Sequence, residues 1–186
     1  VTRKRRNADK SLNSLLGTIS YATKASVHET RFWITDVKSG VPGNIVAPND
    51  GSRQNDAILR GMHKYTKVLN HQWQGSLSLT ASRHQLDFFD PSANLESLSK
   101  SHHLGLRSGL RYLHTSNAQL RISAAHNYGW IRTSEYEAPD RHHSVFQLNG
   151  YLRTRTNLGI FPSIRVDRYS DFGSAISASI GFNQPI

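Results

Sequence analysis

The sequence predicts an all-β protein, an antiparallel transmembrane β-barrel segment of about nine up-and-down meander strands. Three observations support this prediction. Apolar and polar residues alternate along most of the 186-residue chain, the connections between alternating segments are short and long in turn, and only 37% of the residues are hydrophobic. Alternate side chains of a strand lie on opposite faces. A barrel wall in a membrane uses both faces, because lipid covers the apolar one and water wets the other.

The clearest alternation lies near the C-terminus, between Leu158 and Phe182. Every second residue in its first half is apolar, and the residues between them, such as Ser163, are mostly small or polar. Asp171 and Gly173 suit a tight turn, after which the alternation resumes. The segment is therefore predicted to be a hairpin of two strands.

The other strands are predicted by the same alternation, in chain order. In residues 72–82 the second face carries only Gln, Ser and Thr. Burying such groups without hydrogen-bond partners costs about 2–7 kcal/mol each, so this face must meet water. Altogether, strands are expected over about residues 12–22, 27–36, 57–69, 72–82, 102–112, 119–130, 146–153, 158–167 and 176–182.

Polar segments rich in turn residues separate these strands. Three are long and lie over about residues 37–55, 87–101 and 133–143. Four are short and lie at about residues 23–26, 69–71, 115–117 and 156–157. Outer-membrane barrels have short periplasmic turns and long extracellular loops, so these lengths orient the predicted barrel. Aromatic residues near the strand ends would suit its interfacial girdles, namely Trp73, Tyr112, Tyr128, Trp130, Tyr169 and Phe182.

The chain carries a formal charge of +10, from 23 Lys and Arg against 13 Asp and Glu. Such a charge first suggests a polyanionic partner such as nucleic acid. Apart from the run Arg3 to Arg6, the basic residues are scattered rather than clustered, so no nucleic-acid partner is expected. A wet lumen tolerates charge, whereas an arginine facing lipid at the midplane costs roughly 2–4 kcal/mol. The lumen-facing charges are predicted to be Arg107, Arg111, Arg121 and Arg165.

The chain contains no cysteine, which excludes disulfides and thiolate metal sites. It has no run of about 18 apolar residues, so no membrane-spanning helix is predicted. The N-terminal VTRKRRNADK lacks an initiator methionine and is not followed by the apolar segment of a secretory signal. We therefore expect residues 1–186 to be a piece of a longer protein.

The ten histidines invite a metal-binding or catalytic interpretation, above all the pairs His102–His103 and His142–His143. Adjacent residues of a strand point to opposite faces, so neither pair can chelate a metal as a unit. We expect solvated histidines, with no metal, no cofactor and no catalytic residue. A hydrolase that uses His126 on the outer wall is the catalytic alternative, but no nucleophile motif singles out a serine.

The segment FPSIRVDRYSDFGSAISASIGFNQPI, residues 161–186, resembles barrel strands of TonB-dependent outer-membrane receptors. The shared pattern is a strand ending in Arg-x-Asp-x-Tyr-Ser-Asp-Phe-Gly that turns into Ser-x-x-Ser-x-x-x-Gly. The GVPG of residues 40–43, followed by Ala47-Pro48 and the run Arg-Gln-Asn at residues 53–55, is similar to a loop in receptors of the cobalamin and siderophore type.

The resemblance implies a transporter in the bacterial outer membrane that imports a metal chelate (a siderophore) or a vitamin such as cobalamin. Residues 1–186 would be part of the receptor β-barrel domain, with the plug domain and the remaining strands absent. No plug sequence or TonB-contacting box is found, and the predicted strands are fewer than the family's about 22. The implied partners are outer-membrane lipid and lipopolysaccharide, the TonB complex through the missing plug domain, and a small-molecule or metal-chelate ligand.

Ligand contact is expected in the first long loop, although turn formation alone would explain its glycines and proline. The expected residues are Gly40, Val41, Pro42, Gly43 and Arg53. Two roles stay open for Arg107, Arg111 and Arg165, which are attraction of an anionic ligand and pairing with carboxylates of a plug or of the lumen.

Two further functions stay open. One is a passive porin or a small outer-membrane barrel with a structural or adhesive role. The other is a soluble antiparallel β-protein that binds a polyanion. A plug domain upstream in the same reading frame would decide for the receptor, and recovery without detergent would decide for the soluble protein.

Overall fold

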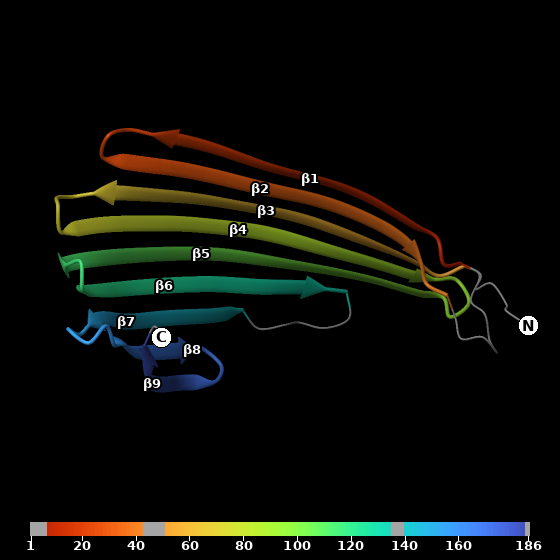
Figure 1. The fold of residues 1–186 in the computed structure, drawn as a ribbon. Helices are drawn as coiled ribbons and strands as arrows, with labels where there is room; N and C mark the ends of the chain where they lie inside the picture. The colour runs from red at the N-terminus through yellow and green to blue at the C-terminus, as the bar shows by residue number, and fades with distance from the viewer. Residues whose placement is uncertain (1–6, 43–50, 135–139, 185–186) are drawn as a thin grey trace, which may run out of the picture.

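The computed structural model describes residues 7–42, 51–134 and 140–184. Nine strands in these ranges follow one another in a single antiparallel sheet, in the order β1 to β9 (Figure 1). Their bounds are Lys10–Ala22 (β1), Ser26–Gly40 (β2), Arg53–Val68 (β3), Trp73–Asp90 (β4), Leu95–Thr115 (β5), Ala118–Thr133 (β6), Arg141–Arg153 (β7), Gly159–Tyr169 (β8) and Gly173–Asn183 (β9). The predicted all-β meander is confirmed, whereas the sheet is open, with β1 and β9 as its edges. In the described ranges, no helix has the length and hydropathy to span a membrane.

The strand registers bring the predicted apolar residues onto one face of the sheet. Leu79 of β4 lies opposite Leu106 of β5, and in the C-terminal hairpin Val166 lies opposite Ile176. Each strand pairs with the next almost without a register shift, so alternate residues stay on the same face of the sheet from β1 to β9. The residues of a strand that share one face are called its phase below. One face is therefore mainly apolar and the other mainly polar.

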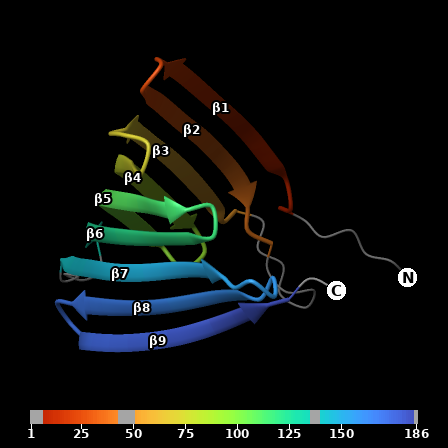
Figure 2. The ribbon, with the colours of Figure 1, turned by 60° about the vertical axis from the view of Figure 1, so that its left-hand side comes forward.

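The sheet is strongly curved, as Figure 2 shows. Side chains of the polar phase from β3 to β8, such as Lys64 and Ser163, line one trough. The polar face is therefore the concave face, and the apolar face is the convex one.

No hydrophobic side chain of the described residues is buried. On the convex face, Ile19, Leu79 and Ile176 are 66%, 54% and 76% exposed. A single sheet has no second layer that could bury its apolar face, and contiguous apolar surfaces of this extent are rare on soluble monomers. The convex face therefore needs an apolar environment.

The apolar part of the convex face has a limited height. In β4 it covers the nine residues from Trp73 to Ala81, and the next side chain on that face is Arg83. In β5 the band runs between Leu104 and Tyr112, which lie opposite those two ends of the band in β4. A transmembrane β-strand needs roughly 9–11 residues. The height of this apolar band is therefore that of a membrane-spanning wall.

Aromatic rings of the convex face lie toward both ends of the apolar band. The rings of Trp73 and Tyr112 lie 4.6 Å apart between their centroids, near the short turns. Those of Tyr128 and Trp130 are stacked 5.0 Å apart, toward the other end. These positions agree with the predicted girdle residues.

Tyr169 was predicted as a girdle residue, and this prediction was wrong. The register places Tyr169 opposite His143, and the two rings are stacked with centroids 4.0 Å apart. Tyr169 lies two residues from Asp167 and four from Arg165, so it shares their polar, concave face.

The second predicted long loop, over residues 87–101, was also wrong. β4 continues to Asp90 and β5 begins at Leu95, so a short turn joins them. The Asp90 carboxylate accepts hydrogen bonds of 2.9 and 2.7 Å from the backbone N–H and hydroxyl of Ser92, and Asn94 has a φ of 49°. Asp and Asn close turns in this way. Beyond the apolar band both faces carry a mixture of polar and apolar side chains, such as Leu86, Asp87 and Phe89, so the period of two is no longer visible in the sequence.

The first and third predicted loops are shorter than expected. β2 extends to Gly40 and β3 begins at Arg53, so both strands enter the predicted loop over residues 37–55. β6 ends at Thr133 and β7 begins at Arg141, which shortens the third loop at its C-terminal side. Backbone pairing continues there although the side chains are polar.

Candidate functional site

The candidate functional site is the trough of the concave face, which has a volume of about 930 Å³. Its lining consists mainly of hydroxyl, amide and cationic side chains. The hydroxyl and amide groups come from Thr66, Gln74, Ser76, Ser78, Thr80, Gln119, Ser123, Asn127, Gln147, Asn149 and Ser163. Such groups both donate and accept hydrogen bonds, so the trough can hold water or a polar solute along its length.

Four cations line the trough, namely Lys64, Arg107, Arg111 and Arg121. Lys64 and Arg107 both lie opposite Ser78 of β4, one on each side of that strand. The described lining contains no aspartate or glutamate. The trough is therefore positively charged over its middle strands.

Arg111 and Arg121 lie directly opposite each other on β5 and β6. Gln119 holds the Arg111 guanidinium, because its Oε1 atom accepts hydrogen bonds from Nε at 3.0 Å and from Nη2 at 2.7 Å. Like charges at directly opposed positions destabilise a sheet. In the described part of the chain neither arginine has an ion-pair partner.

Two glycines shape the trough floor between these cations. A Cβ atom on Gly105 would lie 2.5 Å from Thr80 Oγ1 and 2.8 Å from Asn127 Oδ1. A Cβ atom on Gly109 would lie 2.8 Å from Ser76 Oγ. Gly105 and Gly109 flank Arg107 at two-residue spacing, so they share its face. The missing side chains make room for polar groups of the neighbouring strands.

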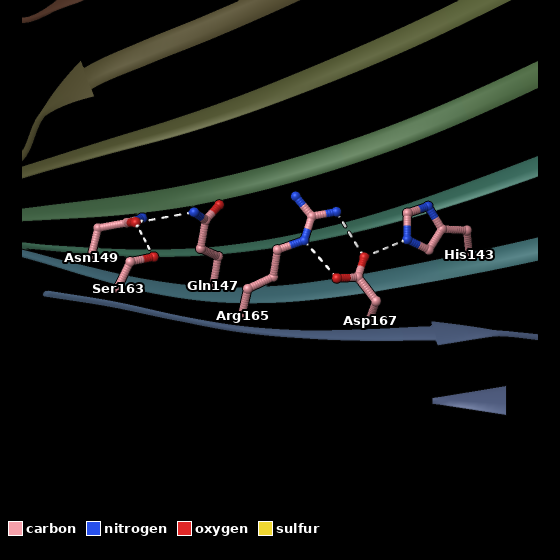
Figure 3. Close-up of polar contacts among 6 residues, drawn as sticks. All are labelled: His143, Gln147, Asn149, Ser163, Arg165 and Asp167. Carbon is pink, nitrogen blue, oxygen red and sulfur yellow. Dashed lines mark hydrogen bonds and ion pairs between the residues drawn. The ribbon is translucent and has the colours of Figure 1, made fainter. Parts of the chain in front are cut away.

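Arg165 differs from the other three predicted arginines because it pairs with a carboxylate, as the close-up in Figure 3 shows for Arg165. Its Nε and Nη2 atoms donate hydrogen bonds of 2.6 and 2.7 Å to the Asp167 carboxylate. His143 Nε2 lies 2.7 Å from the same carboxylate. The structure places all four arginines on the concave face, but the charge of Arg165 is compensated there.

A second polar network on β7 and β8 continues toward the short turns (Figure 3). Asn149 Oδ1 accepts hydrogen bonds from Gln147 Nε2 at 3.0 Å and from Ser163 Oγ at 2.9 Å. These amides and the hydroxyl orient one another across the two strands. They present a fixed polar wall on this side of the trough.

Sequence reasoning missed an aromatic pair in the trough. The rings of Tyr151 and Phe161 lie 5.2 Å apart between their centroids, on the concave face. Tyr151 lies opposite Gln119, the residue that holds Arg111. Both aromatics stand in the polar phase of their strands, and this departure from the pattern is a signal that sequence reading could have used.

Four of the predicted ligand-contact residues, Gly40, Val41, Pro42 and Arg53, lie at or just beyond the far ends of β2 and β3, away from the trough lining. Asn7 Nδ2 donates hydrogen bonds to the backbone oxygens of Ser52, at 2.7 Å, and Val41, at 3.3 Å. The backbone N–H of Gly40 donates to the carbonyl of Asp9 at 2.9 Å. These contacts tie the chain before β1 to the ends of β2 and β3.

Arg53 is also used in this attachment. Its Nη1 atom lies 2.6 Å from Asp9 Oδ2, and this hydrogen bond lowers the pKa of Asp9 below its ordinary value. Pro42 follows in the connection, and Gly43 lies outside the described residues. The ligand contact predicted for these positions stays a prediction.

The two predicted histidine pairs are split between the faces of the sheet. His102 stacks on Trp130 of the convex face, with an interplanar angle of 7°, whereas His103 lies opposite Ser82 in the polar phase. His142 contacts Tyr128 on the convex face, and its neighbour His143 lies on the concave face. Across the described ranges, no group of three His, Asp or Glu side chains could hold a metal ion.

His126 lies on the convex face in a short row of polar side chains. Its Nδ1 atom lies 2.9 Å from Ser144 Oγ, and its Nε2 atom lies 3.4 Å from His142 Nδ1. A serine and a histidine at this distance resemble a nucleophile and its base. At Ser144, however, β7 pairs with strands on both sides. The backbone N–H groups around Ser144 are used in hydrogen bonds between the strands. They are therefore not available for an oxyanion hole, which a serine hydrolase would need.

In comparisons with known proteins, no protein-family model matches this chain, and no curated protein sequence matches it significantly.

Proposed function

We propose that this chain forms part of the wall of a transport barrel in the bacterial outer membrane. The observation that carries the proposal is the nine-residue apolar band of the convex face, which lies directly behind the polar trough. A wall between lipid and water needs these two faces back to back. A soluble polyanion-binding protein would leave the convex face in water, so this alternative is less favoured.

Among transport barrels, we infer the TonB-dependent receptor type, which imports a metal chelate or a vitamin such as cobalamin. The resemblance of residues 161–186 to strands of that family supports this choice. A second feature supports it independently. Leu12, Leu16 and Trp33 belong to the concave phase of β1 and β2, and they are 59%, 72% and 40% exposed.

This apolar group would lie against water in an open pore, at a cost in free energy for each side chain. A plug domain inside the barrel would cover it. The plug would then connect the wall to the TonB complex, while lipid and lipopolysaccharide would cover the convex face. The ligand would pass between the plug and the trough.

A passive porin is the second candidate. The four trough cations favour it, because rings or rows of charged side chains select the ions and solutes that enter a pore. A porin needs no plug, and its solutes move down their concentration gradients. The porin and the receptor share the wall and differ in what fills the barrel.

Expression of the full reading frame in a bacterial host, with and without TonB, separates these candidates. Both predict recovery in the outer-membrane fraction. Uptake of a ferric siderophore or cobalamin that stops when TonB is deleted would support the receptor. Uptake of small polar solutes that continues without TonB would support the porin. Recovery in soluble extracts without detergent would contradict both.

A further inference from the structure

We propose that the trough binds a polyhydroxylated anion, such as a sugar carboxylate or a sugar phosphate. The binding part of this inference is independent of transport, whereas passage of the solute rests on the porin form of the proposed function. Three features of the trough support it, which are its uncompensated charge, its hydrogen-bonding side chains and its aromatic pair.

The charge of the trough is unusual because carboxylates elsewhere on the concave face are already paired. Glu29 pairs with Arg31 at 2.6 Å, Asp56 contacts His84, and Asp167 pairs with Arg165 at 2.6 Å. None of these carboxylates belongs to the trough lining. The four trough cations therefore stay uncompensated by the described residues.

The opposed pair Arg111 and Arg121 is the centre of the proposed site. Opposed like charges are unfavourable in an empty sheet, and an anion between the two guanidinium groups would remove this repulsion. The planar guanidinium donates two parallel hydrogen bonds to a carboxylate or phosphate. Gln119 fixes the orientation of Arg111, so this group is already positioned for an anion.

The side chains around the arginines complement hydroxyl groups rather than an apolar ligand. Arg121 lies opposite Asn149, which forms the fixed network with Gln147 and Ser163. Arg107 lies opposite Ser78, and the hydroxyl of Thr80 borders Gly105 two residues before Arg107. A solute with several hydroxyl groups can exchange its water for these donors and acceptors without leaving buried polar groups unpaired.

The aromatic pair supplies a face for the ring of such a solute. Tyr151 lies next to Gln119 across the β6–β7 pairing, so the rings of Tyr151 and Phe161 lie beside the arginine pair. Pockets for small molecules commonly combine aromatic surfaces with a few polar groups that fix orientation. A sugar acid offers a ring for the aromatics, hydroxyls for the amides and a charge for the arginines.

The test measures binding and conduction on the protein produced from its full reading frame. Equilibrium dialysis of the detergent-solubilised protein uses galacturonate, glucose 6-phosphate and neutral galactose as probes. We expect one or both anions to bind at least about tenfold more tightly than galactose, because charge-assisted hydrogen bonds are the strong ones. Comparison of the two anions shows whether carboxylate or phosphate is preferred. Equal binding of galactose and the anions would overturn the inference.

Two variants locate the site. Arg111→Gln combined with Arg121→Gln should weaken anion binding about tenfold or more. Arg168→Gln removes the same kind of charge from the convex phase of β8 and should change binding less than about twofold. An equal loss in both variants would contradict a site in the trough.

Ion selectivity tests the porin form of the function and needs no variant, because a barrel filled by a plug would not conduct ions. In planar bilayers under a salt gradient, the sign of the reversal potential distinguishes anion from cation preference. Anion preference supports the inference, and cation preference overturns it while the transport function stands. Anion binding in dialysis without any conductance or uptake would support the site and contradict the transport function.

Discussion

Arg111 of β5 and Arg121 of β6 lie directly opposite each other on the concave face, and Gln119 holds the first of them through two hydrogen bonds. No carboxylate of the described trough lining neutralises them. A sheet gains stability when opposed residues attract and loses it when they repel. The two arginines therefore give the trough a concentrated positive charge in addition to its hydrogen-bonding groups.

Replacing one member of this pair should therefore stabilise the sheet. Arg121→Glu creates an opposite-charge pair with Arg111, and such cross-strand pairs contribute roughly 0.2–1 kcal/mol. We expect a higher free energy of unfolding in urea for the protein refolded into lipid vesicles, together with weaker anion binding. Arg168→Glu is the control, because its cross-strand neighbour on β7 is Ser144. Lower stability of Arg121→Glu would argue against repulsion between the arginines.

The two faces of β5 should respond oppositely to a change in charge. Leu106 belongs to the apolar band and is 49% exposed, whereas Arg107 lies in the trough. Leu106→Arg should impair insertion into lipid vesicles, since an arginine at mid-membrane costs roughly 2–4 kcal/mol. Arg107→Leu should insert nearly as well as the unmodified protein. Equal insertion yields for both variants would contradict the proposed membrane-facing side.

A single methyl group at Gly40 should detach the chain before β1. A Cβ atom there would lie 2.5 Å from the backbone oxygen of Asn7 and 2.8 Å from its carbonyl carbon, so backbone must move. We expect Gly40→Ala to lose about 1–3 kcal/mol of stability and to speed proteolytic cleavage before β1. Gly61→Ala is the matched control in the next strand, because nothing lies within 4 Å of its Cβ position. Similar cleavage rates for the two variants would refute this packing.

The same attachment should weaken in acid. The hydrogen bond from Arg53 lowers the pKa of Asp9 below the ordinary value of 3.8. A carboxylate whose pKa is depressed on folding stabilises the folded state above its unfolded pKa, and this contribution is lost as the pH falls through the folded pKa. We expect hydrogen exchange of the Gly40 amide to speed up below about pH 3.8. The Arg53→Met variant should lack this acid-induced step, and its persistence there would assign it to another group.

The sequence alone determined the strands of the apolar band and their two faces. The period of two is a local property, because successive side chains of a strand point to opposite faces. Each face has one kind of surroundings, apolar or aqueous, so apolar and polar residues alternate in the sequence. Leu106 and Arg107 show this, since their opposite phases follow from adjacent positions. The concave phase of Arg107, Arg111, Arg121 and Arg165 could be deduced in the same way.

Only the tertiary structure decided which residues meet. The opposition of Arg111 and Arg121 depends on the register of two strands, and the compensation of Arg165 depends on the rotamers of Asp167 and His143. The continuation of β4 to Asp90 beyond the apolar band was likewise invisible, because backbone pairing needs no alternation of side chains. Sequence periodicity encodes the environment of each face, whereas contacts across strands are set by the register of backbone hydrogen bonds.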